Sequence, residues 1–414
     1  MKKNRVVITG LGVVSPVGTG IERYWESLLN GRSGINKITK FDTTDYNVKI
    51  AGEVKDFCAE DYMDRKEARR MDRFSQFAVA STAMAIKDSQ LDLEKEDPLK
   101  IGIVLGSGTG GIETMAEQFD ILIQKGPRRV SPFFIPMYIP NMAAAQIAMN
   151  FNAKGPNFTV MTACAAGTHA IGEAFRLIER GDIEIAITGG SEAPITPLAL
   201  AGFTSMKALS TNNEEPDKAC RPFDMHRDGF VMSEGAGIII LESLEHAKKR
   251  DAKIYAELVG YGNTSDAYHI TQPAPDGEGA ARAIEQAIND AGIKYDMVDY
   301  INAHGTSTPL NDKLETMAIK KVFKEHSYKI TISSTKSMVG HLLGAAGAVE
   351  FIATTLTVKY GIVPPTINYQ TKDPDCDLDY TPNKAKAKEI IYALSNSFGF
   401  GGNNGTLLIK KNDQ

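Results

Sequence analysis

The sequence predicts an α/β protein built from two similar halves, and three observations support this prediction. Strand-like and helix-like segments alternate along most of the 414 residues, which is typical of α/β proteins. The segments of the second half repeat those of the first half in the same order. With 43% hydrophobic and 23% charged residues, the chain can form the large core that such a fold needs.

The chain starts with a predicted strand. Residues 6–12 form a short apolar run after a basic N-terminus, a pattern that superficially resembles a signal peptide. Thr9, two glycines and Pro16 interrupt this run early, so we expect a strand and not a cleaved leader.

The same region resembles the glycine fingerprint of dinucleotide-binding folds. Residues 10–15 read Gly-Leu-Gly-Val-Val-Ser, so Ser15 replaces the third glycine. Pro16 then obstructs the helix that should follow. The sequence therefore does not favour a nicotinamide-dependent oxidoreductase.

Three pairs of stretches show the repeat most clearly. Residues 85–91 and residues 287–293 end predicted helices with similar sequences, Ala-Ile-Lys-Asp-Ser-Gln-Leu and Ala-Ile-Asn-Asp-Ala-Gly-Ile. A strand is then expected over residues 101–105 and over residues 299–303. Turns rich in small residues follow, at residues 106–111 and 304–308. Two unrelated α/β segments are the alternative, but matching elements in matching order are hard to obtain by chance.

Cys164 lies where a predicted strand, residues 158–162, turns directly into a predicted helix, residues 170–180. At the first turn of a helix, unpaired N–H groups and the positive end of the helix dipole favour a thiolate. We therefore expect the pKa of this thiol to lie below the value of about 8.5 for a free cysteine, as a nucleophile requires. The alternative is a small buried cysteine that packs under a helix.

The repeat also places two histidines near Cys164. His341 starts the helix of the second half that corresponds to the helix after Cys164, and His304 follows the neighbouring strand. A closing strand is expected in each half, over residues 185–188 and residues 390–394. If the halves pack about a pseudo-two-fold axis, the cysteine and both histidines converge on one site.

The composition argues against several classes of protein. The cysteines are far apart and form no CxxC pair, so neither a disulfide framework nor a zinc site is indicated, and a reducing cytoplasm is predicted. They are Cys58, Cys164, Cys220 and Cys376. No stretch approaches the roughly 20 apolar residues of a membrane span. The net charge of −5 argues against a globally basic nucleic-acid-binding protein, so neither membrane nor nucleic acid is an expected partner.

Five strings of residues, taken together and in order, carry a resemblance to a known family. They are Thr-Ala-Cys at 162–164, Asn-Ala-His-Gly-Thr-Ser-Thr at 302–308, Ser-Thr-Lys-Ser at 334–337, Gly-His-Leu-Leu-Gly-Ala-Ala-Gly at 340–347 and Asn-Ser-Phe-Gly-Phe-Gly-Gly-Asn-Asn at 396–404. From residue 5 to residue 410 the chain resembles the β-ketoacyl-[acyl-carrier-protein] synthases. The resemblance is strongest to the synthase II class of bacterial type II fatty acid synthesis.

The resemblance implies the thiolase fold, in which two related halves form a duplicated αβαβα architecture of five layers. Residues 1–252 would form the N-terminal half, with the nucleophilic cysteine and insertions for dimerisation and the acyl pocket. Residues 253–414 would form the C-terminal half, with two catalytic histidines. Members of the family act as homodimers.

A decarboxylative Claisen condensation is the implied reaction. Cys164 would accept an acyl chain, which then condenses with malonyl-[acyl-carrier protein] to give 3-oxoacyl-[acyl-carrier protein], CO2 and free carrier protein. Acyl carrier protein, loaded with acyl or malonyl groups, is the implied partner, and no cofactor is required. The alternative is a ketosynthase of a specialised polyketide or polyunsaturated fatty acid pathway, because the motifs and chemistry are shared.

By resemblance, groups around Cys164 stabilise negative charge as it develops. The backbone N–H groups of Cys164 and Phe400 would hold the oxyanion of acyl transfer. Neutral His304 and His341 would donate hydrogen bonds to the enolate that forms when the malonyl thioester loses CO2. Phe400, which has a glycine on each side, would also be the gate that admits acyl chains.

Charged and polar residues around the histidines match a supporting network in the family. Lys336 would orient His341 and the malonyl carboxylate, with an ordinary surface lysine as the alternative. Glu350 and Asp312 match the acidic members of this network. A structural Na⁺ or K⁺ is held in relatives at the positions of Asn302, Glu350 and Asn396.

Five residues match the family's substrate contacts. Thr306 and Thr308 would meet the pantetheine arm of the carrier, although threonines in such turns usually satisfy the backbone. Thr109, Phe203 and Phe133 are assigned to the acyl pocket. Thr109 stands where relatives often carry isoleucine, so the preferred chain length stays open.

The carrier protein is acidic, which implies a basic docking surface despite the negative net charge. Basic residues cluster at helical spacing between Arg65 and Arg73, and others follow near Lys125. The expected docking residues are Lys66, Arg69, Arg70, Arg128, Arg129 and Lys207. The alternative for each of them is an ordinary solvated charge.

Related enzymes are disfavoured at identifiable positions. A degradative thiolase would need a second cysteine in the C-terminal glycine turn, where residues 401–404 are Gly-Gly-Asn-Asn. The initiating type III synthase would carry asparagine at the position of His341. An inactive partner subunit would lack the nucleophile, whereas Cys164 is present.

Overall fold

The computed structural model describes residues 3–412, and its main sheet runs through both halves of the chain. In spatial order the strands are β6 (Asn157–Val160), β5 (Ile101–Gly106), β7 (Ile185–Glu192), β8 (Gly235–Ser243), β1 (Val6–Ser15), β9 (Ala256–Ser265), β15 (Asn403–Lys411), β14 (Tyr392–Gly399), β10 (Tyr300–Asn302) and β11 (Thr331–Ser333), and β2 (Gly18–Thr19) pairs with β1.

Strand directions repeat from one half to the other. In the N-terminal half β5 is parallel to β6 and β7, and β8 is antiparallel to β7 and β1. In the C-terminal half β10 is parallel to β11 and β14, and β15 is antiparallel to β14 and β9. This equivalence confirms the duplication predicted from the sequence.

The two halves meet along a short antiparallel pairing of β1 with β9, from Val6 opposite Leu258 to Ile8 opposite Ala256. The chain passes from one half to the other just before β9. The division between residues 252 and 253 stays a prediction.

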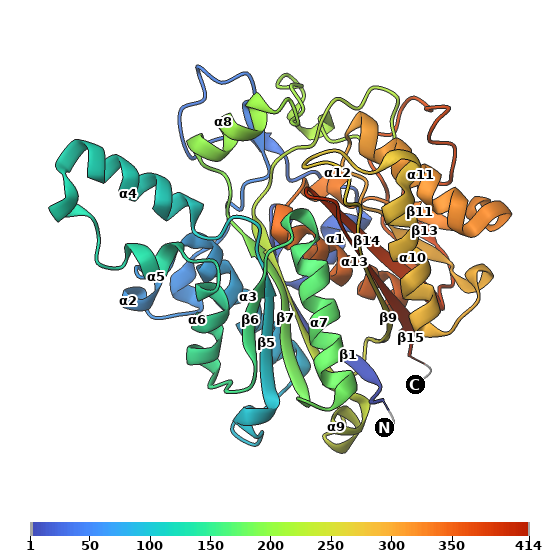
Figure 1. The fold of residues 1–414 in the computed structure, drawn as a ribbon, viewed down its shortest axis with the longest axis horizontal. Helices are drawn as coiled ribbons and strands as arrows, with labels where there is room; N and C mark the ends of the chain where they lie inside the picture. The colour runs from blue at the N-terminus through green and yellow to red at the C-terminus, as the bar shows by residue number, and fades with distance from the viewer. Residues whose placement is uncertain (1–2, 413–414) are drawn as a thin grey trace.

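Four helices complete the layers around the sheet (Figure 1). Helix α3 (Arg73–Ser89) covers the outer face of the N-terminal half, and α10 (Glu278–Ala291) covers that of the C-terminal half. Helices α7 (Ala166–Arg180) and α13 (Ala346–Tyr360) lie between the halves and contact strands of both. The result is the five-layered αβαβα arrangement of the thiolase fold.

The sequence explains these helix positions. Helix α13 is buried from Ala346 to Val358, as its apolar residues on all sides require. Gly12 on β1 lets α3 approach closely, because a Cβ atom there would lie 2.0 Å from the backbone oxygen of Ser81. Gly262 does the same on β9, where a Cβ would lie 1.9 Å from the oxygen of Ala283. The glycines at residues 10–15 therefore lie inside a strand and serve packing, not dinucleotide binding.

Further elements extend this frame. The other helices are α1 (Ile21–Leu29), α2 (Arg65–Ala68), α4 (Ile112–Lys125), α5 (Phe134–Tyr138), α6 (Met142–Phe151), α8 (Pro197–Ser205), α9 (Leu244–Lys249), α11 (Pro309–Phe323) and α12 (Lys336–Val339). The short strands β3 (Asn36–Lys37) and β4 (Ile50–Ala51) form one pair, and β12 (Ile362–Val363) and β13 (Lys386–Ala387) form another. Helix α4 projects from the body of the N-terminal half (Figure 1). No helix within residues 3–412 is both long and apolar enough to span a membrane.

Candidate active site

Both central helices begin with the same backbone geometry. A 3-10 turn precedes each helix, Ala163–Ala165 before α7 and Leu343–Ala345 before α13. The first residue of each turn has a left-handed backbone, with φ of 50° at Ala163 and 47° at Leu343. The residue equivalent to Cys164 is therefore Gly344.

This equivalence corrects the sequence-based prediction, which paired Cys164 with His341. His341 lies before the turn, where its N–H donates to the oxygen of Val231 at 2.8 Å. Its own oxygen accepts the N–H of Ser233 at 3.0 Å. These bonds to a neighbouring segment, and not the start of α13, bring His341 to the site.

Cys164 is buried, with 8% of its surface exposed, and the backbone N–H of Phe400 donates toward its thiol. Burial raises the pKa of the Cys164 thiol to about 12, and the nearby positive charge of Lys336 offsets only part of this increase. The sequence-based expectation of a lowered pKa is therefore wrong for the free thiol. The cost of moving a thiolate out of water exceeds the help from the helix start.

His304 and His341 face each other across the site. Their ring centroids lie 5.5 Å apart and their planes are nearly perpendicular, at 84°. Burial, and then the charge of Lys336, lower the pKa of both imidazoles well below the ordinary value for histidine. Both histidines are therefore neutral at neutral pH, which suits groups that donate hydrogen bonds.

Lys336 fixes the tautomer of His304. Its Nζ lies 3.3 Å from Nδ1 of His304 and donates to the backbone oxygen of His304 at 2.7 Å. An ammonium group can only donate, so Nδ1 accepts and the proton of the neutral ring lies on Nε2. The sequence-based prediction assigned Lys336 to His341, but its hydrogen bonds go to His304, and Nδ1 of His341 has no partner within residues 3–412.

A buried ion pair lies behind the histidines. Lys336 is fully buried on α12, which excludes a surface lysine, and its Nζ lies 2.5 Å from Glu350 on α13. Burial raises the pKa of Glu350 to about 7, even though Lys336 acts in the opposite direction. Lys336 thus balances the Glu350 carboxylate and holds His304 at the same time.

Several buried oxygens near Glu350 have no hydrogen-bond partner among residues 3–412. They are Oδ1 of Asn302, Oγ of Ser395 and Oε2 of Glu350, whose other carboxylate oxygen takes part in the ion pair with Lys336. In contrast, Oδ1 of Asn396 accepts from the hydroxyl of Thr406 at 3.0 Å. Within the described part of the chain, no three or more His, Cys, Asp or Glu side chains gather as metal ligands would. The free oxygens are nevertheless of the kind that Na⁺ or K⁺ prefers, so the residues present fit such an ion.

Asp312, on α11, does not reach the cavity. Its carboxylate accepts the N–H of Phe223 at 2.8 Å and lies 3.7 Å from Nε of Arg227. Glu315, which follows on the same helix, accepts the N–H groups of His304 and Gly305, both at 2.8 Å. The acid that holds the His304 turn most directly is thus Glu315, a residue that we did not predict from the sequence. Its spacing of one helical turn from Asp312 was the available signal.

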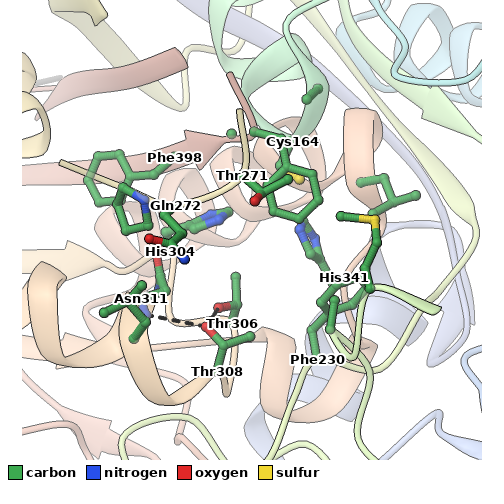
Figure 2. Close-up of a pocket in the computed structure, with 18 of the residues that line it drawn as sticks. Cys164, Phe230, Thr271, Gln272, His304, Thr306, Thr308, Asn311, His341 and Phe398 are labelled. Carbon is green, nitrogen blue, oxygen red and sulfur yellow. Dashed lines mark hydrogen bonds between the residues drawn. The ribbon is translucent and has the colours of Figure 1, made fainter. Parts of the chain in front are cut away.

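A cavity of ≈ 440 Å³ joins these groups. Figure 2 shows Cys164, His304 and His341 around it, with Thr306 and Thr308 on its opposite side. The hydroxyls of Thr306 and Thr308 lie 2.9 Å apart, and the hydroxyl of Thr308 accepts the N–H of Asn311 at the start of α11. The two threonines line the cavity and also satisfy their own turn.

Phe400 is half-buried and lines the cavity in a glycine turn, with φ of 80° at Gly401 and 72° at Gly402. A second segment, residues 266–274, holds this turn and was not predicted from the sequence. The N–H of Gly401 donates to the oxygen of Ile270 at 2.8 Å, and the N–H of Asp266 donates to the oxygen of Gly402 at 2.9 Å. Residues of this segment also line the cavity.

Not all of the predicted acyl-pocket residues line the cavity. Thr109 and Phe203 line the cavity. Phe133 does not, because it lies at the start of α5, where Arg70 covers its ring at 4.6 Å. The hydroxyl of Thr109 donates to Glu192 at 2.6 Å, and Glu192 is a second buried acid that we did not predict from the sequence.

All six predicted docking residues are exposed. Lys66, Arg69 and Arg70 lie in or directly after α2, and Arg128 and Arg129 lie in the 3-10 turn after α4. Lys207 is exposed at the mouth of the cavity. Arg73, which the sequence grouped with these residues, points inward instead and pairs with buried Glu234 at 2.9 Å.

Comparisons with known proteins agree with this geometry. The beta-ketoacyl synthase N-terminal domain model matches residues 3–247, and the C-terminal domain model matches residues 255–370. The chain is 55% identical to a "3-oxoacyl-[acyl-carrier-protein] synthase 2" of Staphylococcus aureus strain COL over 410 residues, which cover 99% of each chain. It is also 55% identical to the protein of the same name in Synechocystis sp., again over 99% of each chain.

Solved structures show the same similarity. A beta-ketoacyl synthase from Burkholderia phymatum STM815 is 35% identical, with a TM-score of 0.92, over 99% of this chain and 100% of that one. A ketosynthase solved with its type II polyketide acyl-carrier protein and bound to the hexaketide is 38% identical, with a TM-score of 0.91, over the same shares. The chain therefore belongs to the β-ketoacyl synthase family.

Proposed function

We propose that this protein elongates fatty acids as a 3-oxoacyl-[acyl-carrier-protein] synthase. It condenses a Cys164-bound acyl chain with malonyl-[acyl-carrier protein] and releases 3-oxoacyl-[acyl-carrier protein], CO2 and free carrier protein. One observation carries this proposal: a cysteine and two neutral histidines converge on one cavity. The alternative, a specialised polyketide or polyunsaturated fatty acid ketosynthase, has less support, because identity is 55% to the fatty acid enzymes and 38% to the polyketide ketosynthase.

Acyl transfer comes first. The Cys164 sulfur attacks the thioester of the acyl carrier protein, and the thiol proton leaves with the carrier's own thiol. The backbone N–H groups of Cys164 and Phe400 stabilise the oxyanion of the tetrahedral intermediate. Because burial disfavours a thiolate, with the thiol pKa at about 12, the neutral thioester is the form of Cys164 that suits this site best.

Decarboxylation follows in the same cavity. The malonyl thioester loses CO2, and the electron pair of the broken bond enters the enolate, whose oxygen accepts hydrogen bonds from His304 and His341. The enolate carbon then attacks the Cys164 thioester, and the released sulfur takes a proton from solvent. Lys336 holds the Nε2 proton of His304 in place for this step.

A structural Na⁺ or K⁺ forms part of the proposal, with Asn302, Glu350 and Asn396 as its holders. The unpartnered oxygens of Asn302 and Glu350 support it. When bound, such an ion would neutralise charge near Glu350 and stiffen the turn that carries His304. The reaction itself moves no electrons to a cofactor, so we propose that none is required.

The partner is acyl carrier protein. The exposed basic residues of α2 and of the turn after α4 support a docking surface for an acidic carrier, and Lys207 lies where the cavity opens. Thr306 and Thr308 line the cavity where a pantetheine arm would pass. The solved ketosynthase that holds its carrier protein supports this partner by similarity.

A homodimer is the proposed assembly. Strand β6 is an edge strand, so its outer backbone groups are free to pair with another strand. Three apolar side chains near this edge are strongly exposed, Met149 on α6, Phe158 on β6 and Met161 after it. An exposed apolar surface at an open edge supports pairing with a second copy.

Mass spectrometry of peptides tests the proposal directly. After incubation with acyl carrier protein that bears an acyl chain, the acyl group is expected on Cys164. Cys164→Ala should lose acylation completely, whereas Cys220→Ala, a change at a buried cysteine outside the cavity, should keep it. Acylation that persists in Cys164→Ala would contradict the assignment.

A further inference from the structure

Glu192 ends strand β7 and is fully buried beside the active site, yet the reaction as proposed gives it no role. Its carboxylate accepts hydrogen bonds from two separate segments. The N–H of Gly108, the N–H of Thr109 and the hydroxyl of Thr109 donate to it at 2.6, 3.0 and 2.6 Å. The N–H of Gly344 donates to it at 2.9 Å. Glu192 therefore ties the turn after β5 to the start of α13.

The two segments approach each other as closely as the backbone allows. A Cβ atom at Gly344 would lie 2.3 Å from the nitrogen of Gly108 and 2.5 Å from Oε2 of Glu192. A Cβ at Gly108 would lie 2.9 Å from the same oxygen. Position 344 therefore requires glycine, and a side chain at position 108 would crowd the Glu192 carboxylate.

This tie acts on the wall of the cavity. Thr109 lines the cavity together with Cys164 and Phe203, and its side chain is turned so that the hydroxyl reaches Glu192. The bond to a buried carboxylate restricts rotation of this hydroxyl, because turning away would break a charge-assisted hydrogen bond. The position of Thr109 is therefore set by Glu192 and not by packing alone.

We propose that Glu192 is a positioning residue that sets the depth of the acyl pocket, by holding Thr109 in the cavity wall and thereby limiting the chain that Cys164 carries. The inference rests on the proposed acylation of Cys164. When the hydroxyl of Thr109 is no longer held, the cavity wall yields more easily. Acylation of Cys164 by long chains then becomes faster relative to acylation by short chains.

The experiment compares acylation rates of Cys164 with octanoyl- and hexadecanoyl-[acyl-carrier protein], measured by mass spectrometry. Thr109→Val keeps the shape of the side chain and removes the hydroxyl, so the ratio of long-chain to short-chain rates should rise about fivefold, the effect of one hydrogen bond. Thr109→Ser keeps the hydroxyl and should show the same ratio as the wild type. In Glu192→Gln only one acceptor oxygen remains for the donors at Gly108, Thr109 and Gly344. This change should therefore raise the ratio at least as much as Thr109→Val.

A matched control separates this role from general stability. Glu242 is also a fully buried glutamate. It lies on β8 opposite Ile185, at the end of the β7–β8 pairing that is far from Glu192. Glu242→Gln should lower the unfolding temperature and leave the chain-length ratio unchanged.

The outcomes distinguish the inference from the proposed function. An unchanged ratio in Thr109→Val would overturn the inference, even if Glu192→Gln failed to fold. An equal change in Glu242→Gln would also overturn it, because the effect would then follow from lost stability. If wild-type Cys164 were acylated by neither chain, the proposed function itself would fail.

Discussion

The starts of the two central helices have the same backbone geometry but carry residues with different chemistry. Before α7 the left-handed turn presents Cys164, and the N–H of Phe400 points at its thiol. Before α13 the same turn presents Gly344, and the carboxylate of Glu192 accepts its N–H. Duplication thus supplied two equivalent positions, of which one holds a nucleophile and the other is closed by an acid.

The difference continues one turn into the helices. Position 350 on α13 is a buried glutamate paired with Lys336, whereas the equivalent position on α7 is Ala170. The N-terminal half supplies the attacking sulfur. The C-terminal half supplies both histidines, the lysine that orients one of them, and the N–H of Phe400. Changes in each half should therefore affect different steps and different properties.

The largest expected effect comes from the buried ion pair. Lys336→Met leaves the Glu350 carboxylate buried without its cation, which should lower the free energy of unfolding by about 3–5 kcal/mol. Urea unfolding measures this change. The double variant Lys336→Met/Glu350→Leu removes both charges and should recover most of the loss. An equal loss in the single and double variants would show that the unpaired Glu350 carboxylate is not the cause of the lost stability.

The histidines give the next largest effect, and it should separate the two steps of the reaction. His304→Ala and His341→Ala should each lower decarboxylation of malonyl-[acyl-carrier protein] by about 10²–10³-fold, because a preorganised hydrogen-bond donor is lost. Acylation of Cys164 should fall less. Release of CO2 and acylation can be measured on the same samples, and unimpaired decarboxylation would break the two-donor scheme.

The same two histidines should make the free energy of unfolding depend on pH in the acidic range. Their pKa is lowered in the folded state, so below about pH 6.5 the unfolded chain binds more protons and the free energy of unfolding falls as pH falls. Removing one histidine, as in His341→Gln, should reduce this slope by about 1.4 kcal/mol per pH unit. Above pH 7 the slopes of variant and wild type should agree. Parallel curves across the acidic range would contradict the lowered pKa.

The smallest effect concerns the docking surface, which lies mainly in the half that carries the nucleophile. Arg69→Glu and Arg128→Glu should each raise KM for carrier-bound substrate by up to about fivefold, as expected for exposed charge pairs, and spare small acyl thioesters. Arg180→Glu, at the far end of α7, is the matched control for an exposed arginine. Equal effects on carrier-bound and small substrates would argue against docking.

Sequence reasoning succeeded where the signal was local. Cys164, His304, Lys336 and His341 lie in contiguous strings, and the repeat appeared as a matching order of strands and helices. It failed where the outcome depended on packing. The pKa of Cys164 depends on burial, and the contact of Lys336 with His304 depends on how α12 turns under the site.

Glu192 was missed for the same reason. Glu192 finds its partners at Gly108 and Gly344, which are far from it and from each other in the sequence. Its one visible sign was an acidic residue at the end of a strand that otherwise carries only small and apolar residues and no other charge. Phe133 lies outside the cavity of its own chain, because the α4–α6 region extends away from that cavity in a way that no local pattern indicated.

The strand order also has a consequence for synthesis on the ribosome. β1 is made first, but its partners β8 and β9 lie in the middle of the chain, so the N-terminal sheet cannot close until half of the protein has emerged. Even then, the face of α7 that packs on α13 stays uncovered until the last third of the chain follows. The growing chain therefore carries a helix with an uncovered apolar face for much of its translation, which is the kind of surface that chaperones bind.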